Sequence, residues 1–219
     1  MFKLWPWFEA NLKRISYVAG AIVILVFFYF YYSYSQKQKE MSAGLALSQV
    51  IFSNGGSQQA DAYLKIAADY PGTTAGQRAL MEGAAALFVT GKFPEAQAQF
   101  QKFLDTFPDN LFTPEALLGL AASLSAQGKT DLAIGAYQKA AAQTADLTVA
   151  ANAKFAIARS YDAQGKIAEA MKLYEEIARA YSNTSMGNEA GLRAMELKKK
   201  LPAAAKPAPT TAAPLNLNK

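Results

Sequence analysis

The sequence of 219 residues contains no cysteine and no histidine. Without cysteine the chain has no disulfide, no zinc–thiolate site and no thiol nucleophile. Without histidine it lacks the commonest general base and the commonest metal ligand. Carboxylates remain, but acid pairs such as Glu175 and Glu176 are adjacent and therefore point to different faces of a helix. No cluster combines a nucleophile, a base and an orienting group, so we expect no enzyme and no cofactor or metal site.

The middle of the chain also lacks the positive charge that the net value of +5 suggests. Residues 1–40 hold five Lys/Arg against two acids, and residues 185–219 hold six against two. Residues 41–184 hold eleven basic and thirteen acidic residues. A nucleic-acid-binding face would place the excess on the folded part, so we expect no nucleic-acid partner.

One uncharged stretch, ISYVAGAIVILVFFYFYYSYS, occupies residues 15–35. As a helix, its first eighteen residues span roughly 27 Å, close to the thickness of a bilayer's hydrocarbon core. Tyrosines cluster at its far end and Trp5 and Trp7 precede its start, as is typical of helix ends at lipid headgroups. A buried core helix is the alternative, but charged pairs bound the run on both sides, which favours a transmembrane helix.

A cleaved signal peptide would have a shorter apolar region ending at a small-x-small site. The run instead ends in YYSYSQKQKE, so we expect a retained anchor. Lys3, Lys13 and Arg14 precede the span, whereas Lys37 and Lys39 follow it. Three charges against two favour a cytoplasmic N-terminus by a small margin.

Three glycines, Gly91, Gly128 and Gly165, recur at a spacing of 37 residues. An alanine stands seven residues before each glycine, a second alanine five residues after it, and an aromatic residue nine after it. These residues are Ala84, Ala121, Ala158, Ala96, Ala133, Ala170, Phe100, Tyr137 and Tyr174. One more step back reaches Tyr63, which indicates a degenerate first repeat with its turn at 54–56. A fixed period of this length marks a stack of supersecondary units.

Each repeat position has a local physical reason. The glycine ends a helix in a left-handed conformation, and the alanines let paired helices approach closely. The aromatic residue fills the space between one pair and the next. Abundant alanine and only nine prolines agree with an all-α fold.

With these positions in this order, residues 40–184 resemble tetratricopeptide repeats, and residues 80–108, LMEGAAALFVTGKFPEAQAQFQKFLDTFP, are the best copy. The period is 37 rather than 34, and the first repeat has Gln59 where alanine is expected. The resemblance implies an all-α solenoid of about four helical hairpins, at 40–72, 73–109, 110–146 and 147–184.

The ends of the chain complete the expected organisation. Residues 1–14 form an N-terminal flank, 15–35 the transmembrane helix, and 36–201 the repeat domain with a capping helix at 186–201. Residues 202–219, PAAAKPAPTTAAPLNLNK, are Pro/Ala-rich and cannot build a core, so we expect a disordered tail.

The tripeptide Gly128-Lys129-Thr130 resembles the end of a nucleotide-binding loop. Such a loop needs a glycine five residues earlier and a preceding buried strand, but position 123 is serine and 116–126 has a helical pattern. We therefore expect the turn of a repeat hairpin. The lysines that follow the three glycines either solvate these turns or form a basic ladder.

In the tetratricopeptide family, one set of first-helix positions faces the groove of the solenoid. The 37-residue register places these positions at Arg78, Met81, Phe88, Leu118, Asn152, Phe155 and Arg159. The resemblance implies a protein-binding groove for a polypeptide segment, oriented by the two arginines. The alternative is that the large apolar residues pack against facing helices.

Residues 8–50 resemble the start of the bacterial ancillary translocon-subunit family, with an aromatic-acid-Asn-Lys approach, one span and a small-residue first helix. The resemblance implies a single-pass inner-membrane scaffold with a periplasmic repeat domain. Its partners would be a translocon subunit, a chaperone or a client polypeptide. The repeats alone resemble envelope organisers of cell-wall, division or outer-membrane assembly machinery equally well. The oligomeric state stays open.

Overall fold

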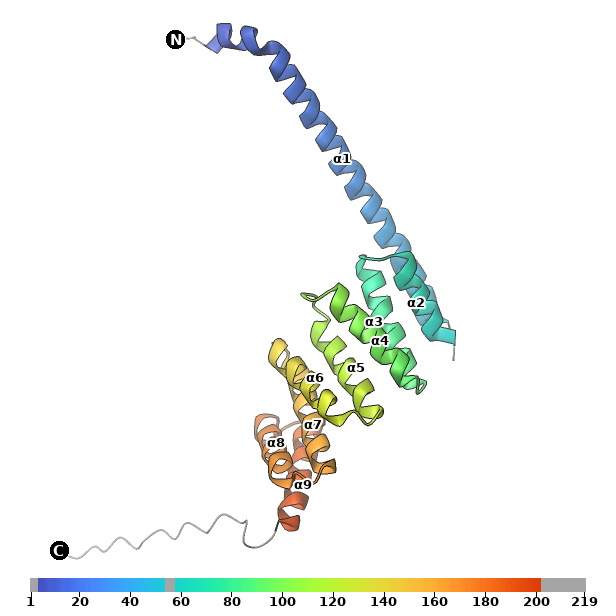
Figure 1. The fold of residues 1–219 in the computed structure, drawn as a ribbon, viewed down its shortest axis with the longest axis vertical. Helices are drawn as coiled ribbons and strands as arrows, with labels where there is room; N and C mark the ends of the chain where they lie inside the picture. Colours follow the sequence, from blue (N-terminus) through green and yellow to red (C-terminus); the bar gives the residue numbers. More distant parts are fainter. Residues whose placement is uncertain (1–3, 54–57, 202–219) are drawn as a thin grey trace, which may run out of the picture. The chain divides into compact units, whose positions relative to one another are not determined.

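The structure, a computed structural model, describes residues 4–53 and 58–201. The described residues form α-helices joined by turns, with no strand among them (Figure 1). The turn predicted at 54–56 and the tail predicted at 202–219 lie outside the described residues. The chain divides into two compact units, residues 1–92 and residues 93–219, and each is described by itself.

The first unit contains α1 (Leu4–Phe52), α2 (Gln59–Asp69) and α3 (Thr74–Val89). The predicted membrane span and the first repeat helix prove to be one uninterrupted helix, α1. Residues 36–41, QKQKEM, join the two parts and contain neither glycine nor proline. Gln, Lys, Glu and Met all have high helix propensity, so the helix continues although the hydropathy falls.

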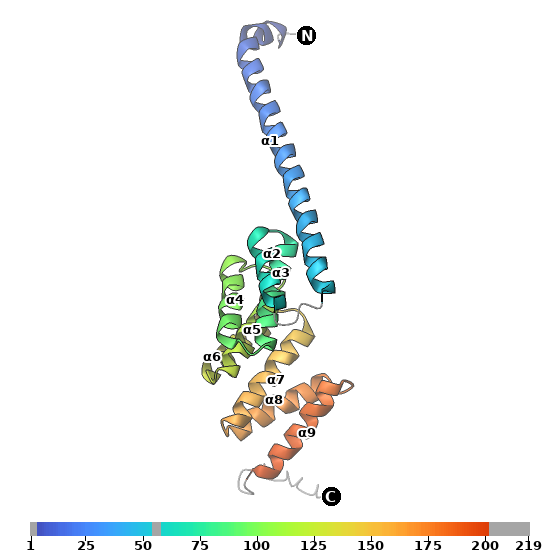
Figure 2. The ribbon, with the colours of Figure 1, turned by 90° about the vertical axis from the view of Figure 1, so that its right-hand side faces the viewer.

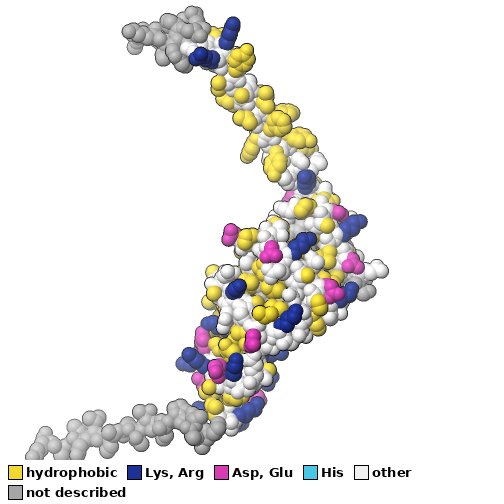
Figure 3. All heavy atoms as spheres, in the orientation of Figure 1, with side chains coloured by type: hydrophobic (Ala, Val, Ile, Leu, Met, Phe, Trp, Pro, Cys, Tyr) yellow, Lys and Arg dark blue, Asp and Glu magenta, His cyan; other side chains and the backbone are white. Residues whose placement is uncertain are grey.

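The apolar part of α1 contacts nothing else in the described structure. The segment Asn11–Phe52 is long and apolar enough to cross a membrane, by length and composition, with a mean hydropathy of 2.0 in its most apolar window. None of that window is buried inside the protein. Hydrophobic side chains cover this stretch, with basic side chains at both of its ends (Figure 3). It therefore differs from the core helix of a soluble protein.

The final turns of α1, in contrast, build the core of the first unit. Ala43 and Leu47 are buried in one cluster with residues of α2 and α3. The other members of this cluster are Tyr63, Ile66, Ala75 and Ala79. A Cβ on Gly76 would meet Tyr70, and one on Gly83 would meet Leu64, so α2 runs antiparallel to α3. The end of α1 lies beside both helices (Figure 2).

A carboxylate of α1 also closes the start of α3. The backbone N–H of Thr74 donates to Glu40 Oε2 at 2.9 Å, and that of Ala75 donates to Glu40 Oε1 at 3.1 Å. The first backbone N–H groups of a helix have no partner within the helix, and a negative charge there is favourable. Glu40 therefore joins α1 to the N-terminus of α3 at a fixed height along α1.

The described part of the second unit, residues 93–201, contains six consecutive helices. They are α4 (Phe93–Thr106), α5 (Thr113–Ala126), α6 (Thr130–Gln143), α7 (Leu147–Ala163), α8 (Ile167–Ala180) and α9 (Ser185–Lys200). Consecutive helices pack against each other from α4 through α9. Side-chain caps start two of them: Asp146 accepts from Thr148 N at 2.7 Å, and Thr184 accepts from Gly187 N at 3.1 Å.

The positions that define the repeat are buried as predicted. All six repeat alanines have no exposed surface, and the repeat aromatics, including Tyr63, are at most 8% exposed. Small residues at these sites permit close helix packing, and the aromatic rings fill the space between hairpins. At the C-terminal end, Ala190, Ala194 and Leu197 of α9 pack with Tyr174, the last of the repeat aromatics, in one buried cluster.

The three turn glycines have the predicted left-handed conformation, with φ values of +77°, +75° and +73°. At each turn the following lysine's backbone N–H bonds to the carbonyl five residues before it; Lys129 N, for example, bonds to Leu124 O at 3.0 Å. This bond, with a second one from the glycine N–H, is the Schellman pattern that satisfies the last carbonyls of a helix.

Candidate protein-binding surfaces

The Gly128-Lys129-Thr130 turn joins α5 to α6, so it follows a helix rather than the strand that a phosphate loop requires. The Lys129 ammonium donates to Gln127 Oε1 at 2.9 Å and to Gln97 Oε1 at 3.3 Å. Its equivalent Lys166 lies over the ring of Tyr161, 5.4 Å from the centroid. Lys166 therefore contacts its own hairpin, whereas Lys129 also bonds to Gln97 on α4 of the preceding hairpin. Among the described residues no cluster of three or more His, Cys, Asp or Glu could hold a metal ion.

The predicted groove residues of the first unit lie on α3. Arg78 is exposed and pairs with Glu82 one turn later, with Nε and Oε1 3.6 Å apart. Met81 and Phe88 are half-buried. This ion pair lies on the exposed face of one helix and adds little stability, so Arg78 can exchange it for a contact with a partner.

The predicted groove residues of the second unit differ among themselves. Asn152 and Arg159 on α7 are exposed, and Leu118 on α5 is half-buried. Phe155 is half-buried and packs its ring on Tyr174. Leu118, Asn152 and Arg159 thus keep surface for a partner, whereas Phe155 contributes to the core of its own hairpin.

Arg159 acts on the two repeat tyrosines of the second unit. Burial raises the pKa of Tyr137 above its ordinary value of 10.0, and the positive charge of Arg159 opposes this shift. Burial is also the main reason why the pKa of Tyr174 is raised, with Asp162 adding to the shift and Arg193 and Arg159 opposing it. Both phenols therefore stay neutral at physiological pH, as rings packed between hairpins.

The second helices of the hairpins form a surface that the sequence did not reveal. A groove of about 590 Å³ lies between α4 and α6 with α5 as its floor, and we call it the α4–α6 groove. A groove of about 540 Å³ lies between α6 and α8 with α7 as its floor, and we call it the α6–α8 groove. Nine of the ten residues lining the α6–α8 groove stand 37 positions after a residue lining the α4–α6 groove. The two grooves are therefore one repeated feature of the fold.

The two copies differ in chemistry. The α4–α6 groove is lined by the leucines Leu104, Leu117, Leu120, Leu124 and Leu132. The equivalent residues of the α6–α8 groove are Ala141, Lys154, Ile157, Tyr161 and Glu169. Leu132 leaves 64% of its surface exposed at the rim. Charged residues line both copies, Asp131 and Lys139 in the first and Lys154, Glu169, Lys172 and Glu176 in the second, so the first copy offers a partner more leucine and the second more charge.

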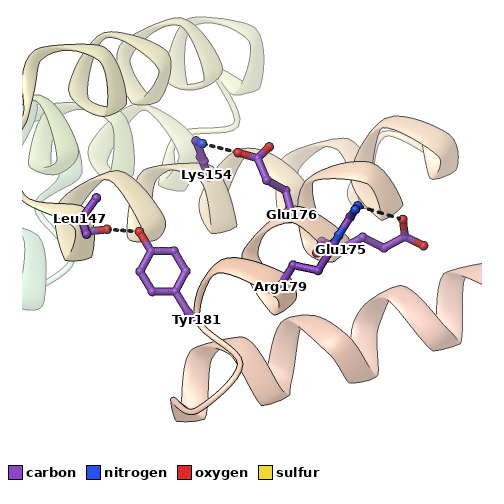
Figure 4. A network of polar contacts seen from close by, with 6 residues as sticks. All are labelled: Leu147, Lys154, Glu175, Glu176, Arg179 and Tyr181. Carbon is purple, nitrogen blue, oxygen red and sulfur yellow. Dashed lines mark hydrogen bonds and ion pairs between the residues drawn. The ribbon is translucent and has the colours of Figure 1, made fainter.

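Polar contacts fix the helices beside the α6–α8 groove (Figure 4). The Lys154 ammonium donates to Glu176 Oε1 at 2.5 Å, which bridges α7 and α8. The Tyr181 hydroxyl donates to the Leu147 carbonyl at 2.7 Å and ties the end of α8 to the start of α7. The ion pair is exposed on both sides and of modest strength, so a charged partner can compete for it.

The 37-residue register relates the lining residues of the two grooves to each other, but it does not show that the second helices enclose a hollow.

A family model described as a tetratricopeptide repeat-like domain matches residues 6–174. The chain belongs to this family. The match begins before the apolar part of α1 and ends within α8, so the apolar helix is part of the matched range. No curated protein matches the chain.

Solved structures of tetratricopeptide repeats confirm the all-α solenoid fold. A tetratricopeptide repeat protein from Parabacteroides merdae superposes with a TM-score of 0.59 at 12% identity, over 74% of this chain. The chain spans 61% of that protein. Tetratricopeptide-like repeats of a kinesin light chain-type protein from Podosopora anserina give a TM-score of 0.55 at 14% identity, over 74% of this chain and 84% of that one. At such identities the likeness concerns the fold. The tetratricopeptide fold is generally a non-catalytic scaffold for protein–protein interaction.

Proposed function

We propose that this tetratricopeptide repeat-like protein is a membrane-anchored scaffold that binds other proteins through its repeat domain. One observation carries the proposal: among the described residues, none of the most apolar window of α1 is buried, while the same helix continues into the core of the first hairpin. Soluble monomers rarely expose contiguous apolar surface on this scale, and a bilayer would cover it. A membrane helix and a binding domain then share one continuous element.

Two features support a retained anchor rather than a cleaved signal peptide. The uncharged run at residues 15–35 is longer than the apolar region of a signal peptide, which has about 7–15 residues. The helix α1 also continues unbroken beyond the end of the apolar run, and its residues Ala43 and Leu47 lie in the core of the first unit.

Binding would use the α4–α6 groove for an apolar helix or extended segment, with the α6–α8 groove beside it supplying charge. The alternative surface is the set of exposed first-helix residues, chiefly Arg78, Asn152 and Arg159. Contacts of micromolar strength suffice on either surface, because confinement of both partners to one membrane raises their local concentration toward the millimolar range.

The finer proposal places the protein in the bacterial inner membrane, with its N-terminus in the cytoplasm and its repeats in the periplasm. The resemblance of residues 8–50 to ancillary translocon subunits supports a neighbour in the secretion translocon, or a periplasmic chaperone or client. An envelope organiser for cell-wall, division or outer-membrane assembly machinery is the competing function. The identity of the cross-linked partners separates the two.

Topology is tested first, and the lack of native cysteine makes single-cysteine labelling unambiguous. Cysteines replace Lys13, before the span, and Lys129, in an exposed turn of the repeats. We expect a membrane-impermeant maleimide to label Lys129→Cys in spheroplasts and Lys13→Cys only after lysis. The reverse pattern would invert the topology, and recovery of the chain in the soluble fraction would refute the anchor.

Partners are then identified by photo-crosslinking in intact membranes, with probes at Leu132 and Glu169, which occupy equivalent positions of the two grooves. Matched probes at Phe88 and Asn152 test the first-helix face, and a probe at Lys129 serves as the turn control. Adducts to translocon subunits or emerging chains would support the secretion role, and adducts to cell-wall machinery the organiser role. Absence of adducts from all four surface probes would contradict a scaffold function.

A further inference from the structure

The Glu40 bridge sets the height of the first hairpin above the proposed membrane surface. Tyr34, the last tyrosine of the apolar segment, precedes Glu40 by six residues, or about 9 Å along a helix. The headgroup layer on each side of a bilayer is roughly 5–8 Å thick. If the tyrosines lie at the interface, as aromatic belts do, Glu40 stands at the outer edge of the headgroups.

Two hydrogen bonds bring the start of α3 to this same height, because Thr74 N and Ala75 N both bond to Glu40. From there α3 runs away from the apolar segment: Ala75 and Ala79 share a core cluster with Ala43 and Leu47, which follow Glu40. The turn before α3, residues 70–73, therefore lies on the apolar-segment side of the Glu40 bridge. Pro71 and Gly72 in this turn are exposed.

The charges at this end suit phospholipid headgroups. Lys37 and Lys39 are exposed on α1 and can approach lipid phosphates. The carboxylate of Glu40 is engaged by the positive end of α3, which lowers its repulsion of those phosphates. Asp69, at the end of α2, is an exposed acid next to the turn.

The geometry points to a second membrane contact in this protein: the turn at residues 70–73 rests on the phospholipid headgroups beside the span. This inference depends on the proposed membrane anchor. The span and the turn together support the first hairpin at two points. Its inclination to the bilayer is then fixed, whereas the span alone would leave α1 and the hairpin packed on it free to tilt.

The test uses the full chain in nanodiscs of phosphatidylethanolamine and phosphatidylglycerol that contain a lipid with a nitroxide on its headgroup. A fluorophore is attached to single cysteines at Tyr34, Pro71 and Val89, one variant each. Val89 is the matched control, because it is exposed on the same unit and lies at the other end of α3, about 22 Å from Thr74. We expect quenching at Tyr34 and Pro71 that is severalfold stronger than at Val89.

Strong quenching at Tyr34 with equal, weak quenching at Pro71 and Val89 would overturn the headgroup contact and leave the anchor intact. Weak quenching at Tyr34 would instead contradict the proposed membrane anchor itself. Glu40→Ala, checked for retained helix content by circular dichroism, removes the bridge and should reduce quenching at Pro71 while leaving Tyr34 unchanged. Unchanged quenching at Pro71 in a folded Glu40→Ala protein would show that the bridge does not set the height of the turn.

Discussion

The ring of Phe155 meets the ring of Tyr174 edge to face, with centroids 5.3 Å apart and ring planes at 70°. Tyr174 is the repeat aromatic of the same hairpin and is 1% exposed. A residue expected in the partner-binding groove thus holds α7 to α8. Its neighbour Asn152, about one turn earlier on α7, is exposed.

Replacing Phe155 by alanine should therefore reduce stability. Loss of a half-buried ring and of an aromatic pair is expected to lower the free energy of unfolding by about 2–3 kcal/mol. Asn152→Ala, on the same helix, should change it by less than about 0.5 kcal/mol. Urea unfolding of the full chain in detergent micelles, followed by circular dichroism, measures both. Equal midpoints for the two variants would mean that the Phe155 ring contributes nothing to the hairpin.

Two glycines, Gly128 in the turn between α5 and α6 and Gly135 within α6, offer a matched pair of substitutions. Gly128 has φ +75°, where an alanine costs about 1–2 kcal/mol, so Gly128→Ala should lower the melting temperature. Gly135 lies within α6 and a Cβ there would meet no atom within 4 Å, so Gly135→Ala should stabilise by about 0.5–1 kcal/mol. Thermal unfolding should show shifts of opposite sign, and shifts of the same sign would contradict the left-handed turn.

The sequence predicted those parts of the fold that depend on local or periodic requirements. A left-handed turn needs glycine and close helices need alanine, so Gly91, Gly128 and Gly165 and the alanines around them locate the hairpins. The continuous helix α1 was not predicted, because a change from apolar to polar residues looked like a boundary. Backbone propensity, rather than hydropathy, decides whether a helix continues.

Tertiary contacts were harder to infer. Glu40 lies 34 residues from Thr74, and nothing in the sequence marks this carboxylate as the partner of the first backbone N–H groups of α3. The α4–α6 groove likewise depends on the spacing of two second helices across a first helix. The leucines Leu120 and Leu132 show an apolar pattern, but only the packed structure shows that they line one hollow.

A close approach between hairpins gives a third prediction. A Cβ on Gly119 would lie 2.3 Å from Cζ of Phe100, and that ring is only 4% exposed and cannot easily move aside. Gly119→Ala should therefore destabilise by about 1–3 kcal/mol through overpacking. Gly44→Ala on α1, where a Cβ meets no atom within 4 Å, is the control and should not destabilise.

Relief of the clash tests its cause. In the double variant Gly119→Ala/Phe100→Leu the smaller side chain makes room, so the combined loss of stability should be smaller than the sum of the two single losses. Additive losses would indicate that Gly119 is required for another reason.

Alkaline pH should unfold the repeats through their buried tyrosines. Burial raises the pKa of Tyr174 above its ordinary value of 10.0, and Tyr137 is raised in the same way. The folded state therefore favours the neutral phenol. This contribution is fully present below pH 10 and is lost as the pH rises through the folded pKa. Tyr174→Phe keeps the ring and removes the titrating group, so its melting temperature should fall less steeply above pH 10 than that of the native chain.

Ultraviolet absorbance of the phenolate measures the same shift directly. The other tyrosines are common to both proteins, so the difference between the titrations of the native chain and Tyr174→Phe isolates Tyr174. We expect its midpoint above that of a free tyrosine. Arg159→Gln removes a positive charge that opposes the shift, and it should raise the midpoint further. An unchanged midpoint in Arg159→Gln would mean that the charge of Arg159 does not act on Tyr174.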